Sequence, residues 1–408
     1  MFTEITDDLT GAADSGSYFT GRGKKVTICL SRDSAFPRKG DEMISINLSS
    51  RNTAPEAARQ LHFDLMKKLD SDGQLLIKKI GTGFRGNDSM ELRGLLEAEP
   101  GYLAFVIDHA PDLGTFTLYG NQYCEGEILT KSVYADDPVM PPKESFIPAI
   151  LGAEHGIQTG LVDIDAVKGG RILEETSKRI SEGCRIIVFD AVTREDTRRL
   201  IETLYPVYRN VFWTGSLGIA DGLAEYFLGS WQKNFFPARD IRCLGFCASA
   251  YGIARKQIEY SRQRGLHVAP LDIDAYIDGD AGAIERCVRE MKESIKIGNT
   301  MLLPLTEKYS YQPGTSCCIL EAVKRAASEV CGSDDFERLI VMGGETSQKV
   351  FQASGVNYLE LGRPLEPGTA QGKILDGVMK GKEFSLKGGS MGTEPTLEKM
   401  MCRREVWY

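Results

Sequence analysis

The sequence predicts an α/β protein made of two domains with mainly parallel sheets. Short apolar runs that suit strands alternate with amphipathic helical stretches along nearly the whole chain, which is typical of parallel sheets covered by helices. The chain has 408 residues, which is longer than a chain that usually folds around a single hydrophobic core. A polar and aromatic stretch at 229–237 separates two alternating series, so we predict domains at 1–235 and 236–408 with a ligand cleft between them.

Strands and helices follow one another in both halves. Before residue 235 the predicted strands lie at 2–6, 26–30, 43–48, 75–80, 103–107 and 185–189. The predicted helices, with apolar residues at helical spacing, lie at 55–68, 89–96 and 195–204. In the second half the predicted strands lie at 241–246, 267–271, 300–305, 338–342 and 384–386. Helices are predicted near 253–264, 283–297, 316–330, 348–353 and 396–401.

Composition argues against several classes of protein. A formal net charge of −8 disfavours a general nucleic-acid binder and a protein that binds anionic membranes. No segment approaches the roughly 20 apolar residues that span a bilayer, and the first residues lack the pattern of a signal peptide. The ten cysteines form no paired CxxC pattern, and the four histidines are dispersed. We therefore expect a cytoplasmic homodimer with reduced thiols and no nucleic-acid or membrane partner.

Two aspartates directly follow the first predicted strand. Asp7 and Asp8 precede the small residues Thr10 and Gly11, which could open a helix, and Asp14 follows. Two explanations stay open at this strand-to-helix junction. The acids could cap the helix and complement its dipole, or they could bind a ligand where strand ends and helix N-termini converge.

Other predicted strands of the first half also end in polar residues. Arg51 follows the third strand, and a glycine-rich loop with Thr82 and Arg85 follows Lys78 and Lys79. Parallel strands bring such ends to one edge of a sheet, where cations and carboxylates together suit a small polyhydroxylated acid. Since neighbouring residues of a strand face opposite sides, one of the two lysines could simply be solvated.

Three turns of small residues follow predicted strands of the second half. They read CASA at 247–250, GGET at 343–346 and KGGSMG at 387–392. Paired glycines at a strand-to-helix turn allow backbone N–H groups to approach an anion closely. Together the turns indicate a nucleotide site, although none has the GxxxxGK[ST] pattern of a P-loop or the GxGxxG pattern of dinucleotide sites.

These motifs together resemble the four-carbon acid sugar kinase family, in order and from one end of the chain to the other. DDLTGAAD at 7–14 matches the N-terminal signature of the family, and KKIGTGFRGN at 78–87 is similar to its KKxDSTLRGN. Further similar motifs are DP at 137–138, DAVT at 190–193, GSLG at 215–218, GGET at 343–346 and KGGSMG at 387–392. The resemblance implies a two-domain kinase that phosphorylates threonate, erythronate or 3-oxotetronate with ATP.

The resemblance also implies which residues bind the two substrates. The substrate residues would be Asp8, Arg51 and the loop that begins at Lys79, with Thr82 and Arg85. The ATP residues would be Ser249, Gly343, Gly344, Glu345, Thr346 and Gly389. With ATP and Mg²⁺ on the glycine turns, Asp8 would orient or deprotonate the attacking hydroxyl, and Asp7 or Asp14 would support the metal or the loop. Arg51 and Arg85 would hold the substrate carboxylate or the developing phosphate charge, so Asp8 and Arg85 are the predicted catalytic residues.

The chain departs from the family pattern in the predicted substrate loop. Gly81-Thr82-Gly83 stands where the family has Asp-Ser-Thr, which removes a carboxylate and a hydroxyl. The APDLGT stretch at 110–115 lacks the arginine of the family's PAFPxxGR, and ASAY at 248–251 differs from its GSxS turn. One alternative is therefore a catalytically impaired homologue that binds a sugar acid or nucleotide without phosphoryl transfer. A second is a Rossmann-type oxidoreductase, although the chain lacks GxGxxG after its first strand.

Overall fold

The chain forms two compact units. The computed structural model describes residues 1–30, 42–69, 73–136, 140–152, 156–280, 282–310, 312 and 314–407, so the Asp137-Pro138 motif and His155 lie outside the described residues. One unit comprises Met1–Val26 and Ser31–Trp231, and the other comprises Thr27–Leu30 and Gln232–Tyr408. The early segment joins the second unit because the Leu30 N–H donates to the carbonyl of Asn357 at 2.8 Å. The predicted single boundary between residues 235 and 236 does not include this assignment of Thr27–Leu30 to the second unit, since the contact joins segments far apart in the sequence.

The first unit contains a parallel sheet with the strand order β3-β1-β4-β11-β5-β10-β9. The strands are β1 (Phe2–Thr6), β3 (Met43–Asn47), β4 (Leu75–Lys79), β5 (Leu103–Ile107), β9 (Thr159–Val162), β10 (Ile186–Phe189) and β11 (Val211–Gly215). Thr6, at the end of β1, pairs with Asn47 of β3 and with Lys79 of β4. The carboxyl ends of these three strands are therefore level, and the loops that follow them leave from one edge of the sheet.

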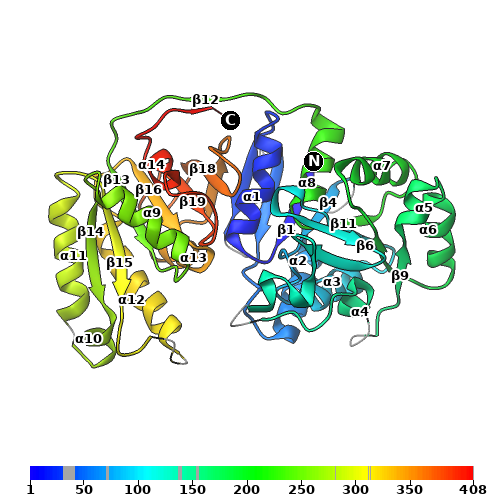
Figure 1. Ribbon diagram of the computed structural model, residues 1–408, viewed down its shortest axis with the longest axis horizontal. Helices are drawn as coiled ribbons and strands as arrows, with labels where there is room; N and C mark the ends of the chain where they lie inside the picture. The colour runs from blue at the N-terminus through cyan, green and yellow to red at the C-terminus, as the bar shows by residue number, and fades with distance from the viewer. Residues whose placement is uncertain are drawn as a thin grey trace. The chain divides into compact units, whose positions relative to one another are not determined.

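Helices cover both faces of this sheet. Along one face lie α1 (Leu9–Thr20), α7 (Arg194–Leu204) and α8 (Leu217–Leu228), and along the other lie α2 (Pro55–Lys68), α3 (Asp88–Ala98) and α4 (Ile147–Gly152) (Figure 1). The helices α5 (Ile164–Lys168) and α6 (Ile172–Ser181) lie beside β9 and α7. A small antiparallel sheet consists of β6 (Thr115–Leu118), β7 (Asn121–Cys124) and β8 (Glu127–Ile128). Because both faces are covered, the central strands are buried, and β5 and β10 are wholly apolar, whereas β1 and β4 also bury Glu4, Lys78 and Lys79.

The second unit contains a sheet with the order β14-β15-β13-β16-β19-β18-β17, and most of β2 (Val26–Cys29) continues it beside β17. The strands are β13 (Cys243–Cys247), β14 (His267–Asp272), β15 (Thr300–Leu305), β16 (Arg338–Met342), β17 (Tyr358–Leu361), β18 (Thr369–Ile374) and β19 (Glu383–Lys387). They run parallel from β14 to β19, whereas β18 is antiparallel to both β19 and β17. The predicted α/β class with mainly parallel sheets is confirmed.

The helices of the second unit also form two groups. In one group, α9 (Gly252–Arg262) contacts α14 (Thr396–Met400). In the other group, α12 (Thr315–Val330) contacts the remaining three helices, which are α10 (Ile273–Ile277), α11 (Gly282–Ser294) and α13 (Gly344–Ala353), and α10 also contacts α11. The pair β12 (Phe235–Phe236) and β20 (Val406–Trp407) joins the two ends of this unit. The strands that follow β13 in the chain therefore lie on both sides of it in the sheet. In such sheets ligands bind at the carboxyl ends of the strands, at the point where the strand order reverses.

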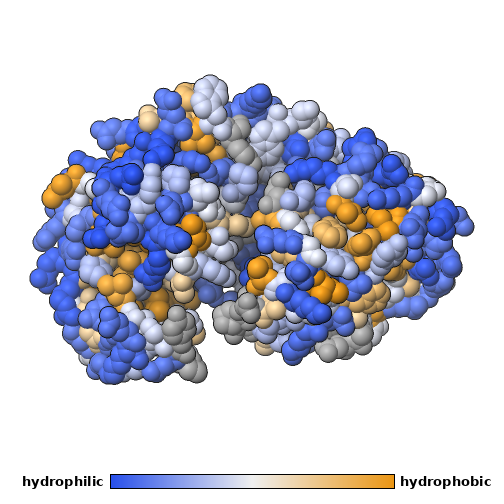
Figure 2. Space-filling view, viewed as in Figure 1, coloured by the Kyte–Doolittle hydropathy of each residue, from blue (hydrophilic) through white to orange (hydrophobic). Residues whose placement is uncertain are grey.

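The surface is mostly hydrophilic on the face shown in Figure 2, where hydrophobic residues form small, separate patches. Trp407 is 76% exposed, although one side of its ring lies against Phe235, with the ring centroids 4.5 Å apart. In the described part of the chain, no helix is both long enough and apolar enough to cross a bilayer.

Candidate functional site

Asp8 lies at the turn between β1 and α1 and caps the helix. Its backbone is extended, with φ −146° and ψ 161°, and its Oδ1 accepts a hydrogen bond from the Gly11 N–H at 2.8 Å. Thr10 Oγ1 donates to the other carboxylate oxygen, Oδ2, at 2.6 Å. An aspartate here satisfies a helix N–H that has no partner within the helix, and it places negative charge at the positive end of the helix dipole.

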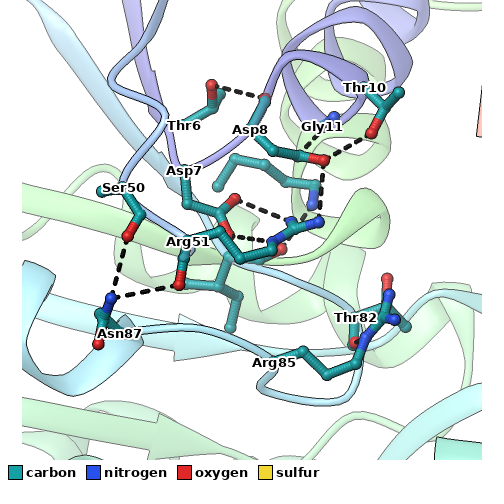
Figure 3. A network of polar contacts seen from close by, with 12 residues as sticks. Thr6, Asp7, Asp8, Thr10, Gly11, Ser50, Arg51, Thr82, Arg85 and Asn87 are labelled. Carbon is teal, nitrogen blue, oxygen red and sulfur yellow. Dashed lines mark hydrogen bonds and ion pairs between the residues drawn. The ribbon is translucent and has the colours of Figure 1, made fainter. Parts of the chain in front are cut away.

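Arg51 joins Asp8 to Asp7. Its Nη1 donates to Asp8 Oδ2 at 2.8 Å, while its Nε and Nη2 donate to the two oxygens of Asp7 at 2.7 and 3.1 Å (Figure 3). Burial would raise the pKa of Asp7, but the charges of Arg51 and Lys78 outweigh it and lower the pKa of Asp7 to about 2. The two aspartates therefore differ: Asp8 is the cap and keeps 16% of its side chain exposed, whereas Asp7 is fully buried in an ion pair.

Asn87 holds the turn that carries Arg51. Its Nδ2 donates to the backbone carbonyls of Ser50 and Arg51 at 3.0 and 3.3 Å (Figure 3). It also donates to the carbonyl of Thr53 at 3.0 Å. The sequence does not indicate this role for Asn87, although Asn87 ends the KKIGTGFRGN motif, because the motif alone does not show which turn the side chain reaches. Asn87 is the residue through which the 81–87 loop fixes the position of Arg51.

Lys78 and Lys79 are both buried, although they face opposite sides of the sheet. Lys78 Nζ lies 2.6 Å from Glu91 Oε2, and Glu91 also accepts a hydrogen bond from Ser50 Oγ at 2.5 Å. Lys79 Nζ donates to the carbonyl of Ile80 at 2.5 Å. The suggestion that one of these lysines is solvated is wrong, because helices cover both faces of the sheet at this point.

Lys79 lies on the α1 side of the sheet, close to the start of the helix. A Cβ added to Gly11 would lie 3.5 Å from Lys79 Nζ. On the same side, burial raises the pKa of Glu4 and of Asp14 to about 7, although the charge of Lys79 lowers both. Lys79 therefore supplies positive charge beside Asp8, in a region where the other acids are partly protonated near neutral pH.

The 81–87 loop has a shape that requires glycine. Gly83 and Gly86 have φ values of 78° and 147°, in the range that disfavours residues with a side chain. A Cβ on Gly83 would meet the Tyr134 ring at 3.0 Å, and a Cβ on Gly81 would lie 2.8 Å from the carbonyl oxygen of Arg85. The Asp-Ser-Thr sequence of the related motif would therefore not fit this loop unless the loop moved.

Arg85 projects from this loop beside Thr82. Its Nε donates to the carbonyl of Thr82 at 3.2 Å, and its guanidinium carbon lies 5.2 Å from the centroid of the Tyr134 ring. Figure 3 shows the two residues together on the loop, apart from the Asp8–Arg51 pair. The predicted substrate residues thus form two groups within the first unit, one around Asp8 and Arg51 and one around Arg85.

The DAVT and GSLG motifs support the backbone. Asp190 accepts hydrogen bonds from the N–H groups of Tyr119, Gly120 and Ile164, at 2.5, 2.8 and 2.9 Å. Gly218 lies so close to the segment after β5 that a Cβ would overlap a backbone carbonyl oxygen there. Asp190 of the first motif therefore joins two loops, and Gly218 of the second motif allows α8 to approach the sheet. Both residue types are explained without a ligand.

The three predicted turns of the second unit meet at the carboxyl edge of its sheet. They follow β13, β16 and β19, which are consecutive in the strand order. A Cβ on Gly389 would overlap Ser249 Oγ and lie 2.9 Å from the Tyr251 ring. A Cβ on Gly343 would lie 4.0 Å from that of Ser249 and 3.2 Å from Thr346 Oγ1. The residues predicted to bind ATP are therefore neighbours.

The helix after the second turn begins earlier than predicted. It starts at Gly344 instead of residue 348, so Glu345 and Thr346 belong to its first turn. Gly343 is the N-cap, with φ 110° and ψ 136°, a conformation that favours glycine. Helix N–H groups in the first turn point out of the N-terminus, so this end of α13 suits an anionic ligand.

No protein-held metal is evident from the described residues. They contain no group of three or more His, Cys, Asp or Glu side chains placed to hold a metal ion. Both carboxylate oxygens of Asp7, one of the predicted metal-supporting residues, already accept hydrogen bonds from Arg51. Asp7 is therefore engaged in an ion pair, and no step proposed below depends on a metal held by protein side chains alone.

Comparison with known families identifies both units. The family model described as a sugar-binding N-terminal domain matches residues 3–223, more than half of the chain. The model described as a nucleotide-binding C-terminal domain matches residues 244–397. The two matches follow one another without overlap.

Curated relatives align with nearly the whole chain. A D-threonate kinase of Cupriavidus necator is 27% identical, over 96% of this chain and 95% of its own. A D-erythronate kinase of Heliobacterium modesticaldum is 25% identical over 95% and 93%. A 3-oxo-tetronate kinase of Brucella melitensis is 25% identical over 96% and 92%.

Solved structures share the fold. A Salmonella typhimurium protein superposes with a TM-score of 0.81 and 20% identity, covering 96% of this chain and 97% of its own. A Haemophilus influenzae protein of the DUF1537 family gives a TM-score of 0.76, also at 20% identity, with 98% and 99% covered. Since both family models match in order and the kinase relatives align from end to end, the chain belongs to the four-carbon acid sugar kinase family.

Proposed function

We propose that this protein is an ATP-dependent kinase that phosphorylates a hydroxyl of a four-carbon or similar sugar acid, such as threonate, erythronate or 3-oxotetronate. In this proposal residues 1–235 bind the sugar acid and residues 236–408 bind ATP. The observation that carries it is the Asp8 carboxylate, held at the N-terminus of α1 by Gly11, Thr10 and Arg51 but still partly exposed. The names of the relatives indicate the substrate class.

Asp8 would orient the attacking hydroxyl. Donors from Gly11, Thr10 and Arg51 fix both of its oxygens, so a hydroxyl that donates to Asp8 is held in one direction. Phosphoryl transfer depends mainly on such positioning and on charge neutralisation. Asp8 is also placed to accept the proton as the oxygen–phosphorus bond forms.

The substrate carboxylate would bind to Arg85 and to the N–H groups of Arg51 that the aspartates do not use. Three N–H groups of Arg51 already donate to Asp7 and Asp8, and its single charge is shared between two carboxylates. Arg85 is partly exposed, and its aromatic contact with Tyr134 leaves the charge of the guanidinium intact. Lys79 and Thr82 complete the proposed substrate set.

The nucleotide would bind at the three turns of the second unit. Its phosphates would lie against Gly343, Gly344, Glu345 and Thr346 at the start of α13, with Ser249 and Gly389 beside them. Backbone N–H groups at such a glycine-rich helix start bind phosphate without needing side chains. Mg²⁺ is proposed to arrive with ATP, and it supplies charge neutralisation of the phosphates when bound.

The direct test is a coupled assay of ATP consumption with a panel of aldonates of four to six carbons and their 3-oxo forms. We expect turnover with at least one four-carbon acid and no turnover without an acid. If no acid supports turnover while ATP and an acid still bind, the proposed transfer is contradicted. The glycine residues at 81 and 83, which offer no side chain to a substrate, specifically favour such a non-transferring homologue, or else a changed substrate.

Replacing Asn87 by alanine is expected to raise the KM for the sugar acid roughly tenfold while leaving the KM for ATP unchanged. The carbonyls of Ser50, Arg51 and Thr53 lose their shared donor, and a tenfold change in KM corresponds to about 1.4 kcal/mol, roughly the net contribution of one hydrogen bond. The measurement is steady-state kinetics with each substrate varied in turn. Asn121→Ala is the control, since the Asn121 Nδ2 also donates to a backbone carbonyl, but at an exposed turn. Equal effects of the two substitutions on KM would contradict a positioning role for Asn87.

A further inference from the structure

Lys387 is a buried cation at the edge where the three turns of the second unit meet. It is the last residue of β19, and only 1% of its surface is exposed. Its Nζ donates to the carbonyl of Gly388 at 2.7 Å and to that of Gly389 at 3.4 Å. No described carboxylate forms an ion pair with it, so its hydrogen-bond partners carry no net charge.

The acids near Lys387 do not compensate this charge. Glu366, in the loop before β18, is already bound by Thr396 and by Lys399 of α14. Cys247, at the end of β13, is a buried thiol whose pKa is itself raised by burial. Burial lowers the pKa of Lys387 to about 8, although the Cys247 and Glu366 charges oppose this. A buried ammonium without a paired anion is costly, and an anionic ligand beside it would reduce that cost.

The backbone around Lys387 belongs to the same group of turns. Its carbonyl accepts a hydrogen bond from the Gly343 N–H at 2.9 Å, which joins β19 to the start of α13. The two carbonyls that accept from its side chain belong to the turn that contacts Ser249 and Tyr251. The ammonium thus contacts the backbone of one of the three turns that we assign to the nucleotide.

We propose that the Lys387 ammonium binds a phosphate group of the nucleotide, exchanging the carbonyls of Gly388 and Gly389 for phosphate oxygens. This assignment rests on the proposed function, since it presumes that the second unit binds ATP. Lys387 then has the role that a lysine serves in other phosphate sites, a compact positive charge placed by a glycine-rich turn.

The first test compares ATP binding to the full-length protein and its Lys387→Met variant by calorimetry, with Mg²⁺ present and no sugar acid. We expect the variant to bind ATP roughly 10- to 100-fold more weakly, the loss expected for a charge-assisted hydrogen bond, and to bind adenosine equally well. Lys382→Met is the matched control, because Lys382 lies just before the same strand and its Nζ also donates to a backbone carbonyl, that of Phe336. An equal loss in both variants, or none in Lys387→Met, contradicts the assignment.

The second test uses the unmodified protein and therefore does not depend on the folding of a variant. Phosphate beside Lys387 raises its pKa above about 8, so ATP binding at pH 8 takes up about half a proton. Calorimetry in two buffers of different ionisation enthalpy measures this uptake, which should disappear at pH 6, where the lysine is already charged. The same measurement at pH 9 and 10 covers a higher pKa of the free lysine, and ATP binding with no proton uptake at pH 8, 9 or 10 overturns the assignment alone. Absence of ATP binding contradicts the proposed function as well, so the two failures are distinguishable.

Discussion

Replacing Asp8 by asparagine is expected to lower kcat at least about a hundredfold while ATP affinity stays unchanged. The side-chain amide has no negative charge for Arg51 and no capacity to accept the proton of the substrate hydroxyl, and loss of a general base typically costs this much. Asparagine still caps helices well, so the Gly11 N–H keeps an acceptor and α1 should keep its start. The measurement combines steady-state kinetics with ATP titration of the same preparation.

The control for helix capping is Asp163→Asn. Asp163 caps α5 in the same way, accepting from the Ala166 N–H at 2.9 Å, and it has no part in the proposed substrate set. We expect this variant to turn over like the unmodified enzyme. Turnover of the Asp8 variant at the unmodified rate would remove Asp8 from the mechanism, and an equal loss in both variants would attribute the effect to capping.

Replacing Lys78 by methionine is expected to destabilise the protein by about 3–5 kcal/mol, the usual cost of leaving one partner of a buried ion pair uncompensated. Glu91 would lose the ammonium 2.6 Å from its Oε2. Burial, with the charges of Glu91 and Asp7, raises the pKa of Asp88 to about 8, so Asp88 is mostly protonated at pH 7. Removal of Lys78 takes away the cation that contacts Glu91, and so leaves one more buried negative charge uncompensated.

Urea denaturation at pH 7 measures this change in the free energy of unfolding. The double variant Lys78→Met with Glu91→Gln should recover most of the loss, because it removes both charges. Lys308→Met is the surface control: Lys308 and Asp278 are both about half exposed, and solvent screens such pairs so that they contribute little to stability. A Lys78 variant no less stable than the surface control would show that the buried pair does not stabilise this fold.

Much of the fold could be predicted from the sequence because most of its strands are short runs rich in apolar residues that alternate with helical stretches. The predicted helix at 55–68 has the bounds of α2, and the strands at 2–6, 103–107, 300–305 and 338–342 have those of β1, β5, β15 and β16. The start of α13 was misplaced because Gly344 is an unfavourable helix residue, and only the turn at Gly343 makes it the first one. The small antiparallel sheet β6–β8, in a segment without a strong apolar run, was not predicted.

The candidate site could be predicted as a set of strand-end residues but not as a set of contacts. Asp8, Arg51 and Arg85 were selected because each follows a strand, and Ser249 and Gly389 because the family resemblance implies them within turns that follow strands. The structure brings Asp8 to Arg51 and Ser249 to Gly389. Their roles toward ligands stay predictions. The sequence did not indicate the partners of these residues, since those partners lie in other loops.

By itself the sequence determined the fold class, the family and the positions of the turns, because these depend on local periodicity and on short motifs. The tertiary structure decided what each polar residue of those turns contacts. It assigned the cap to Asp8 and the buried ion pair to Asp7, buried both Lys78 and Lys79, and left Lys387 without a carboxylate partner among the described residues. The physical reason is that burial and ion pairing depend on which segments cover a strand end. Those segments are joined by contacts between residues far apart in the chain.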